Sequence, residues 1–175
     1  MAWDLTIYGI DWQKMQANTS LKTSDEVFVW LDMHYKTYQK HFTETEASVF
    51  FREFFHLRSK NICFAINQLV SLLKENFALV LWEKMLLDDD SCYILTKEQI
   101  TEVLIFLKTF AQMLGNETVA ENRYVAFIQQ EIAHTWYKNP ENEFAYFADY
   151  AGIFEDWEAK IQRSDALYFY WENSF

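Results

Sequence analysis

FFREFFHLR, at residues 50–58, is the stretch on which the predicted fold depends. Neither glycine nor proline interrupts residues 44–76, so we read this stretch as part of one long helix or of a pair of helices. The whole chain of 175 residues holds 3 glycines and 1 proline. Because sharp reversals need such residues, their scarcity favours a few long helices over many short strands. The prediction is an all-α protein, a single helical domain over residues 1–175 built as a bundle of five to seven helices.

Capping boxes mark the predicted helix starts, each a threonine followed three residues later by Glu or Gln, whose side chains satisfy free N–H groups of the first turn. They are Thr23–Glu26, Thr43–Glu46, Thr96–Gln99 and Thr118–Glu121, and Asn139-Pro140 provides a fifth start. The helices are expected at residues 24–41, 44–76, 97–114, 119–138 and 140–162, with FALVLWEKMLL (77–87) continuing the second of them. Gly115 is expected to take the left-handed conformation that ends a helix.

Two terminal stretches fit neither the helical period of about 3.6 residues nor the two-residue alternation of a strand. They are LTIYGIDW (5–12) and ALYFYW (166–171). Each is read as a short strand or as an extended arm packed on the bundle. The prediction therefore allows β-structure only at the two ends of the domain.

Two Glu-x-x-His pairs, Glu53–His56 and Glu131–His134, match the ligand spacing of ferritin-like di-metal bundles. On a helical wheel Glu53 and His56 lie opposite the apolar stripe, and His134 lies outside the apolar centre of its helix. Ligands of a di-metal site would point into the bundle, so we predict no metal and no cofactor. A ferritin-like di-metal protein that uses these pairs remains the catalytic alternative.

Other catalytic patterns are missing from the sequence. The run Asp88-Asp89-Asp90 resembles the start of a calcium loop but lacks its glycine and final glutamate. There is no glycine-rich phosphate loop, nucleophile elbow or clustered Cys/His pattern. The prediction is a protein that is not an enzyme.

The net charge of −11 is concentrated in the second half of the chain. Residues 88–175 carry six Lys/Arg against sixteen Asp/Glu. Such a surface repels nucleic-acid phosphates and attracts basic proteins, although acidity can also serve solubility alone. Two cysteines are too few for a disulfide-rich secreted domain. With no signal peptide and no apolar run of about 20 residues, we expect a cytoplasmic protein outside the membrane.

The helix predicted at 140–162 combines an aromatic core stripe with an acidic opposite face. Carboxylates there surround the small residues Ala145, Ala148 and Gly152, a floor that could receive Lys or Arg side chains of a partner. The alternative is an ordinary solvated helix face. The predicted partner-binding residues are Glu141, Asp149, Glu155 and Asp156, with Asp88, Asp89 and Asp90 as a second acidic cluster.

A small, acidic, aromatic-rich helical protein of this kind resembles the immunity proteins that neutralise toxins of interbacterial competition, including contact-dependent growth inhibition systems. The resemblance covers the whole chain in kind and involves no diagnostic motif. It implies stoichiometric inhibition of a toxin domain, commonly a basic nuclease, whose cationic active site the carboxylates would occupy in place of RNA phosphates. A helical adaptor without a toxin partner is the non-catalytic alternative.

Overall fold

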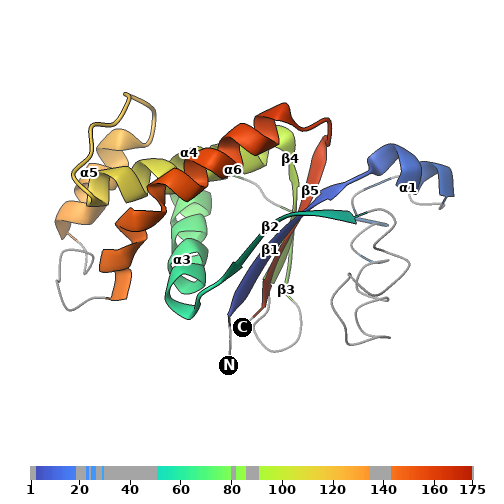
Figure 1. The fold of residues 1–175 in the computed structure, drawn as a ribbon, viewed down its shortest axis with the longest axis horizontal. Coiled ribbons are helices and arrows are strands. Elements are labelled where there is room, and N and C mark those ends of the chain that lie inside the picture. The colour runs from blue at the N-terminus through green and yellow to red at the C-terminus, as the bar shows by residue number, and fades with distance from the viewer. Residues whose placement is uncertain are drawn as a thin grey trace. The chain divides into compact units, whose positions relative to one another are not determined.

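The protein is mixed α/β, and the all-α prediction is wrong. The computed structural model describes residues 3–18, 23, 25–26, 29, 51–79, 82–85, 91–134 and 143–174. Within these residues one antiparallel sheet accompanies a set of helices (Figure 1). Its strands are β1 (Asp4–Ile10), β2 (Phe51–Arg58), β3 (Trp82–Met85), β4 (Ser91–Thr96) and β5 (Tyr168–Ser174), in the order β2-β1-β5-β4-β3.

The two terminal stretches form the centre of the sheet. β1 and β5 pair antiparallel over their full length, from Asp4 opposite Ser174 to Ile10 opposite Tyr168. Residues 5–10 and 169–173 are buried without alternation, because each strand has a neighbouring strand on both edges and is covered on both faces. The reading of these stretches as short strands is confirmed, but they are the core of the fold rather than an addition to a bundle.

FFREFFHLR is an edge strand. Phe51 to Arg58 form β2 and pair antiparallel with β1, so the helix predicted at 44–76 is wrong over these residues. The register shifts between Ile7 and Tyr8, where a β-bulge makes Phe54 the additional residue. The Phe54 ring lies across Gly9: a Cβ added to Gly9 would be 2.5 Å from Phe54 Cε2. Glycine is therefore required at this point for the close approach of the ring.

The helical segments are α1 (Trp12–Asn18), α3 (Lys60–Phe77), α4 (Lys97–Leu114), α5 (Val125–His134), the 3₁₀ helix η5 (Glu143–Tyr150) and α6 (Ala151–Arg163). The expected helix at 97–114 is confirmed at both ends. The expected continuation of α3 through 77–87 is wrong, since Ala78 turns left-handed (φ 51°) and β3 follows. The prediction for 140–162 is correct in being helical over the described residues from Glu143, but its first part is 3₁₀.

The capping boxes have different outcomes. The box at Thr23–Glu26 is confirmed, since the Thr23 N–H donates to Glu26 Oε2 (2.8 Å) and the Glu26 N–H donates to Thr23 Oγ1 (3.3 Å). Thr118–Glu121 begins no helix: α5 starts at Val125, after Asn122 Oδ1 has accepted the Tyr124 N–H (3.0 Å). The box at Thr43–Glu46 and the Asn139-Pro140 start lie outside the described residues.

The end of α4 also differs from the prediction. Asn116, not Gly115, takes the left-handed conformation, with φ 56°. The Asn116 N–H donates to the Met113 carbonyl (3.1 Å) and the Glu117 N–H to the Gln112 carbonyl (2.8 Å), which is the Schellman pattern. The left-handed residue thus lies one position later than predicted, at an asparagine, which tolerates this conformation better than most residues.

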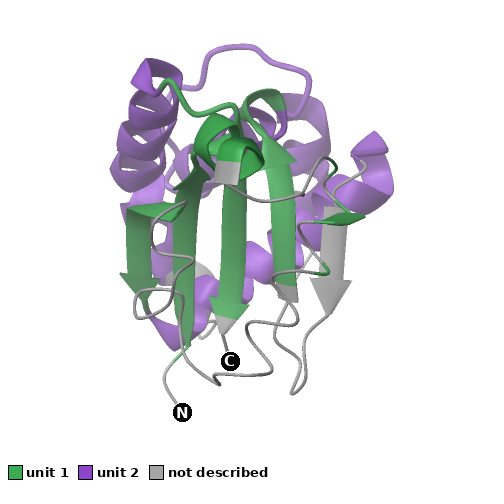
Figure 2. Cartoon of the chain, turned by 90° about the vertical axis from the view of Figure 1, so that its right-hand side faces the viewer, with its two compact units in different colours: residues 1–58, 80–98, 165–175 green, residues 59–79, 99–164 purple. Residues whose placement is uncertain are grey.

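The chain divides into two compact units, each assembled from separated segments (Figure 2). Unit 1 contains residues 1–58, 80–98 and 165–175 and holds the sheet and α1; unit 2 contains residues 59–79 and 99–164 and holds the other helices. Among the described residues, none of the helices combines the length and apolarity needed to cross a membrane.

Aromatic rings dominate the core of unit 2. Phe106 is fully buried, and its ring centroid lies 5.3 Å from that of Tyr124 and 6.3 Å from that of Phe77. Arg123 caps this group with its guanidinium carbon 5.4 Å from the centre of the Phe77 ring. Tyr124 donates a short hydrogen bond to Glu102 Oε2, and burial together with this bond raises the pKa of Tyr124.

Candidate functional site

Three of the predicted partner-binding carboxylates lie on η5 and α6. Asp149, Glu155 and Asp156 are all exposed, and none of them makes a hydrogen bond or ion pair with a described residue. Glu141 and the cluster Asp88, Asp89 and Asp90 lie outside the described residues.

The opposite side of the same segment is firmly buried. Phe147, Phe154 and Ile161 are no more than 1% exposed, and Trp157 is 8% exposed. The rings of Phe147 and Phe154 contact each other in a tilted arrangement with centroids 5.3 Å apart, and Phe154 packs edge to face against Trp157 at 5.8 Å. The expected aromatic core stripe of this helix is confirmed.

Polar contacts attach α6 to α4. Lys108 of α4 forms a short ion pair with Glu158, and Gln162 Nε2 donates to Thr101 Oγ1 at 2.9 Å. Both contacts lie on the flanks of the buried stripe, inside unit 2. The exposed side of α6 is consequently presented by a fixed helix, which lowers the ordering cost of binding a partner.

Two large apolar residues lie among the exposed carboxylates. Tyr146 is 67% exposed and Ile153 is 38% exposed, two of the five large hydrophobic residues that are exposed in the described part of the chain. Tyr146, Asp149, Ile153 and Asp156 follow one another at spacings of three or four residues, which places them along one side of the helical segment, and Gly152 lies three residues after Asp149 on the same side. We call Tyr146, Asp149, Gly152, Ile153 and Asp156 the α6 stripe. Glu155 lies beside it.

Gly152 leaves a gap in the α6 stripe. Apart from its chain neighbours and the backbone of its own helix, no described atom lies within 4 Å of the position that a Cβ would occupy there. The helix backbone is therefore open to solvent between Tyr146 and Ile153 and can be approached closely by a partner side chain. The sequence prediction named Gly152 as part of a small-residue floor, and its exposure agrees with that role without testing it.

The sequence prediction missed Tyr146 and Ile153. On an α-helical wheel of about 100° per residue Tyr146 lies beside the core stripe. The 3₁₀ helix η5 turns by about 120° per residue, so Tyr146 is rotated about 80° further over the four residues that separate it from Tyr150. This rotation turns Tyr146 away from the core. The sequence gives no signal for the 3₁₀ geometry.

The Glu-x-x-His pairs do not form a helical di-metal site. Glu53 and His56 lie on the edge strand β2, whereas Glu131 and His134 lie on α5 in the other unit. Glu53 and His56 are exposed, as predicted, but they lie on a strand and not on a solvated helix face. In the part of the chain that the structure describes, no group of three His, Cys, Asp or Glu residues is arranged to hold a metal ion.

Asp4, His56 and Thr6 on β1 and β2 carry the three groups of a nucleophilic triad. Thr6 Oγ1 is 3.1 Å from His56 Nδ1, and Asp4 Oδ1 is 3.7 Å from His56 Nε2. The second distance is too long for a hydrogen bond that would orient the imidazole. Thr6 is only 6% exposed and lies in the middle of a strand paired on both sides, so a substrate carbonyl cannot reach its hydroxyl.

Tyr8 and Glu172 lie next to this group on the same face of the sheet. Glu172 is 3% exposed and pairs across from Thr6. Burial and the carboxylates of Glu172 and Glu53 raise the pKa of Tyr8, so its hydroxyl stays protonated at neutral pH and cannot act as a base. These residues are best explained as a polar part of the sheet.

Comparison with known proteins adds no relationship. No protein family, curated protein or solved structure matches this chain.

Proposed function

We propose that this chain is a non-catalytic, acidic binding protein that neutralises a toxin by covering the active site of its basic domain, most naturally a nuclease. The observation that carries the proposal is the α6 stripe. It combines exposed apolar residues, Tyr146 and Ile153, with exposed carboxylates that pair with none of the described residues. Aromatic anchors surrounded by charge are the composition from which protein interfaces draw most of their affinity.

A nuclease domain fits this surface because it must bind phosphates. Its active-site cleft presents Lys and Arg side chains, and the carboxylates Asp149, Glu155 and Asp156 would occupy the positions that phosphates take in the substrate complex. The net charge of −11 adds long-range attraction, which raises association rates at low salt. The same charge disfavours direct contact with nucleic acid.

Charge reversal tests the electrostatic part of the proposal. We expect the triple variant Asp149→Lys, Glu155→Lys and Asp156→Lys to associate at least about tenfold more slowly with the toxin encoded by the adjacent gene, and to lose most of the salt dependence of this rate. Surface plasmon resonance at several salt concentrations measures both. Cells that co-express the toxin should lose protection in parallel.

The matched control reverses three exposed carboxylates elsewhere on the same unit, Glu75, Glu117 and Glu121. This control changes the net charge by the same amount. It therefore distinguishes an effect of where the charges lie from an effect of the total charge. Equal slowing by the two triple variants would contradict a specific role of α6. An adjacent gene product that is harmless to cells, or that the wild-type chain does not bind, would contradict the proposed function as a whole.

Tyr146 tests the apolar part. We expect Tyr146→Ala to accelerate dissociation of the complex and to weaken binding by about 2 kcal/mol or more, as truncation of a central aromatic residue does at interfaces. Its association rate should change little, since the net charge is preserved. Phe64→Ala, which removes another exposed aromatic residue of the same unit, is the control and should leave binding unchanged. A Tyr146→Ala complex as long-lived as the wild type would place the contact elsewhere.

A further inference from the structure

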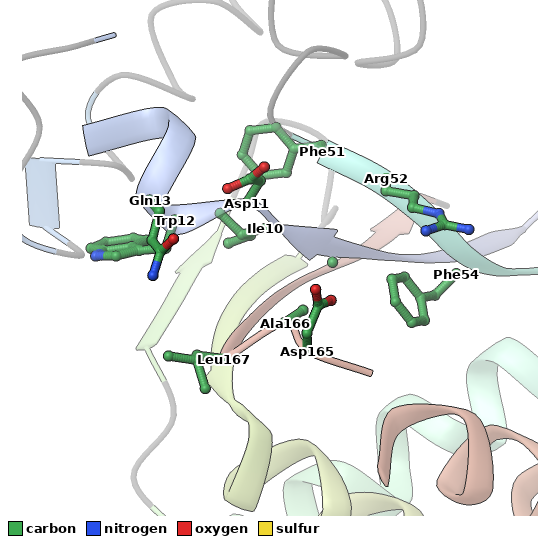
Figure 3. A pocket seen from close by; sticks show the side chains of 11 residues that line it. Ile10, Asp11, Trp12, Gln13, Phe51, Arg52, Phe54, Asp165, Ala166 and Leu167 are labelled. Carbon is green, nitrogen blue, oxygen red and sulfur yellow. The ribbon is translucent and has the colours of Figure 1, made fainter. Parts of the chain in front are cut away.

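A pocket of about 570 Å³ lies within unit 1, where β1 ends, β2 begins and the chain enters β5 (Figure 3). This volume is within the range of about 300–1,000 Å³ that is usual for small-molecule sites. The pocket shares no residue with the α6 stripe. It is lined by Gly9, Ile10, Asp11, Trp12, Gln13, Phe51, Arg52, Phe54, Asp165, Ala166 and Leu167.

Three aromatic side chains line the pocket, Trp12 and Phe51 from one face of the sheet and Phe54 from the other. Trp12 stacks on Tyr168 with centroids 4.6 Å apart. Phe51 is 5% exposed and packs edge to face against Tyr170 at 5.9 Å. Phe54, the residue of the bulge, packs edge to face against Phe169 at 5.6 Å. Because these rings are held by strand residues, an apolar ligand group can bind without reorganising them.

The same pocket contains charges of both signs. Arg52 and Asp165 each make no hydrogen bond or ion pair with any described residue, although both line the pocket. Asp11 uses one carboxylate oxygen, Oδ1, to accept the Lys14 N–H at 3.0 Å and so begins α1. In the view of Figure 3, Asp11 and Trp12 lie towards one end, Arg52 and Phe54 towards the other, and Asp165 between them.

We propose that this pocket binds a small zwitterion with an apolar body, namely an α-amino acid with a large apolar side chain. The ligand carboxylate pairs with the guanidinium of Arg52, the ammonium group pairs with Asp165, and the side chain packs against Phe54, which lies on the same face of the sheet as Arg52. A purely anionic ligand would leave both pocket carboxylates uncompensated, and a purely cationic one would meet Arg52. Only a ligand that carries both charges satisfies both ends.

Calorimetric titration of the full chain with three related probes tests the charge requirement. L-Phenylalanine carries both charges, L-phenylalaninamide lacks the carboxylate, and 3-phenylpropanoate lacks the ammonium group. We expect L-phenylalanine to bind and each of the other probes to bind at least about tenfold more weakly, since each loses one charge-assisted contact. The amide also represents the first residue of a peptide, so its weak binding would assign the site to a free amino acid.

Two variants assign the contacts. Arg52→Gln should remove the preference for L-phenylalanine over the amide, and Asp165→Asn should remove the preference over phenylpropanoate. The controls are Arg58→Gln, on the same strand outside the pocket, and Asp149→Asn in the other unit; neither should change any of the three affinities. Changes in the NMR chemical shifts of the backbone amides of residues 9–13 would locate the ligand independently of the calorimetric titration.

Several results would overturn the proposal. They are no binding of L-phenylalanine by the wild-type chain at about 10 mM, equal affinity for the three probes, and preferences that survive both pocket substitutions. None of these results bears on toxin neutralisation, which depends on the other unit. The failure of one proposal therefore leaves the other open to its own test.

Discussion

Replacement of Phe106 by alanine is expected to lower the free energy of unfolding by about 3–5 kcal/mol, the cost typical of truncating a buried Phe. Phe106 is fully buried and lies near four other rings, those of Phe77, Phe110, Tyr124 and Phe127. Its removal leaves a cavity that these large rings cannot fill without leaving their own positions. Urea denaturation followed by far-ultraviolet circular dichroism measures the change.

Tyr146→Ala is the control for this measurement. It removes an aromatic side chain of similar size from the same unit, but from an exposed position, and should change stability by no more than about 0.5 kcal/mol. A loss at Phe106 as small as the loss at Tyr146 would contradict the packed aromatic core described for unit 2.

Gly9→Ala is the second large effect that we expect, a loss of about 1–3 kcal/mol from overpacking. The new Cβ would lie 2.5 Å from Phe54 Cε2, a separation that two carbon atoms do not tolerate. The Phe54 ring must move, and with it the edge-to-face contact with Phe169. Because Phe54 is the additional residue of the β-bulge, its movement also disturbs the register between β1 and β2.

A double-mutant cycle separates this clash from any general intolerance of the strand to substitution. In a Phe54→Ala background the ring is gone, so Gly9→Ala should cost little or even stabilise the chain by reducing the entropy of the unfolded state. Urea denaturation of the four proteins gives the coupling energy. If Gly9→Ala costs the same in both backgrounds, the close approach of Phe54 is not the reason for the glycine.

The helices were predictable where one face alone is buried. Residues 97–114 show an apolar period that continues unbroken to Leu114, and α4 has these bounds. The Thr23–Glu26 box depends only on groups three residues apart, which the sequence contains completely. Local signals of this kind predict local structure.

The strands were not predictable as a sheet because their signals are weak or ambiguous. β1 and β5 are buried on both faces, so the alternation that identifies a half-buried strand is absent. In FFREFFHLR the aromatic residues satisfy a helical period and a strand equally well in so short a run. Pairing partners lie far apart in sequence, with Ile10 opposite Tyr168, and no local pattern specifies such pairs.

Glycine and proline are scarce in this α/β protein for a topological reason. Strands need tight turns only where sheet neighbours follow one another closely in the chain, and among the described strands only β3 and β4 are separated by so short a segment, residues 86–90. The other connections between strands are long and contain the helices. A sheet built in this way needs few turn residues.

For the candidate site, the sequence was sufficient to select exposed carboxylates and the buried aromatic stripe behind them. It could not select Tyr146, whose exposure depends on the 3₁₀ winding of η5. Nor could it assemble the pocket, since Arg52 and Asp165 come together only through the sheet order. The charge of a residue can be read from the sequence, whereas which residues become neighbours across the sheet depends on the tertiary fold.

The central place of β5 has a consequence for biosynthesis. β1 is made before the other described strands, but the strand that joins it to β4 is made more than 150 residues later, from Tyr168 onward. Until then the nascent chain can form only the separate pairs β1–β2 and β3–β4, each with an unsatisfied inner edge. Completion of the sheet therefore waits for the synthesis of β5, and nascent chains that stall before Tyr168 should depend on chaperones to remain unaggregated.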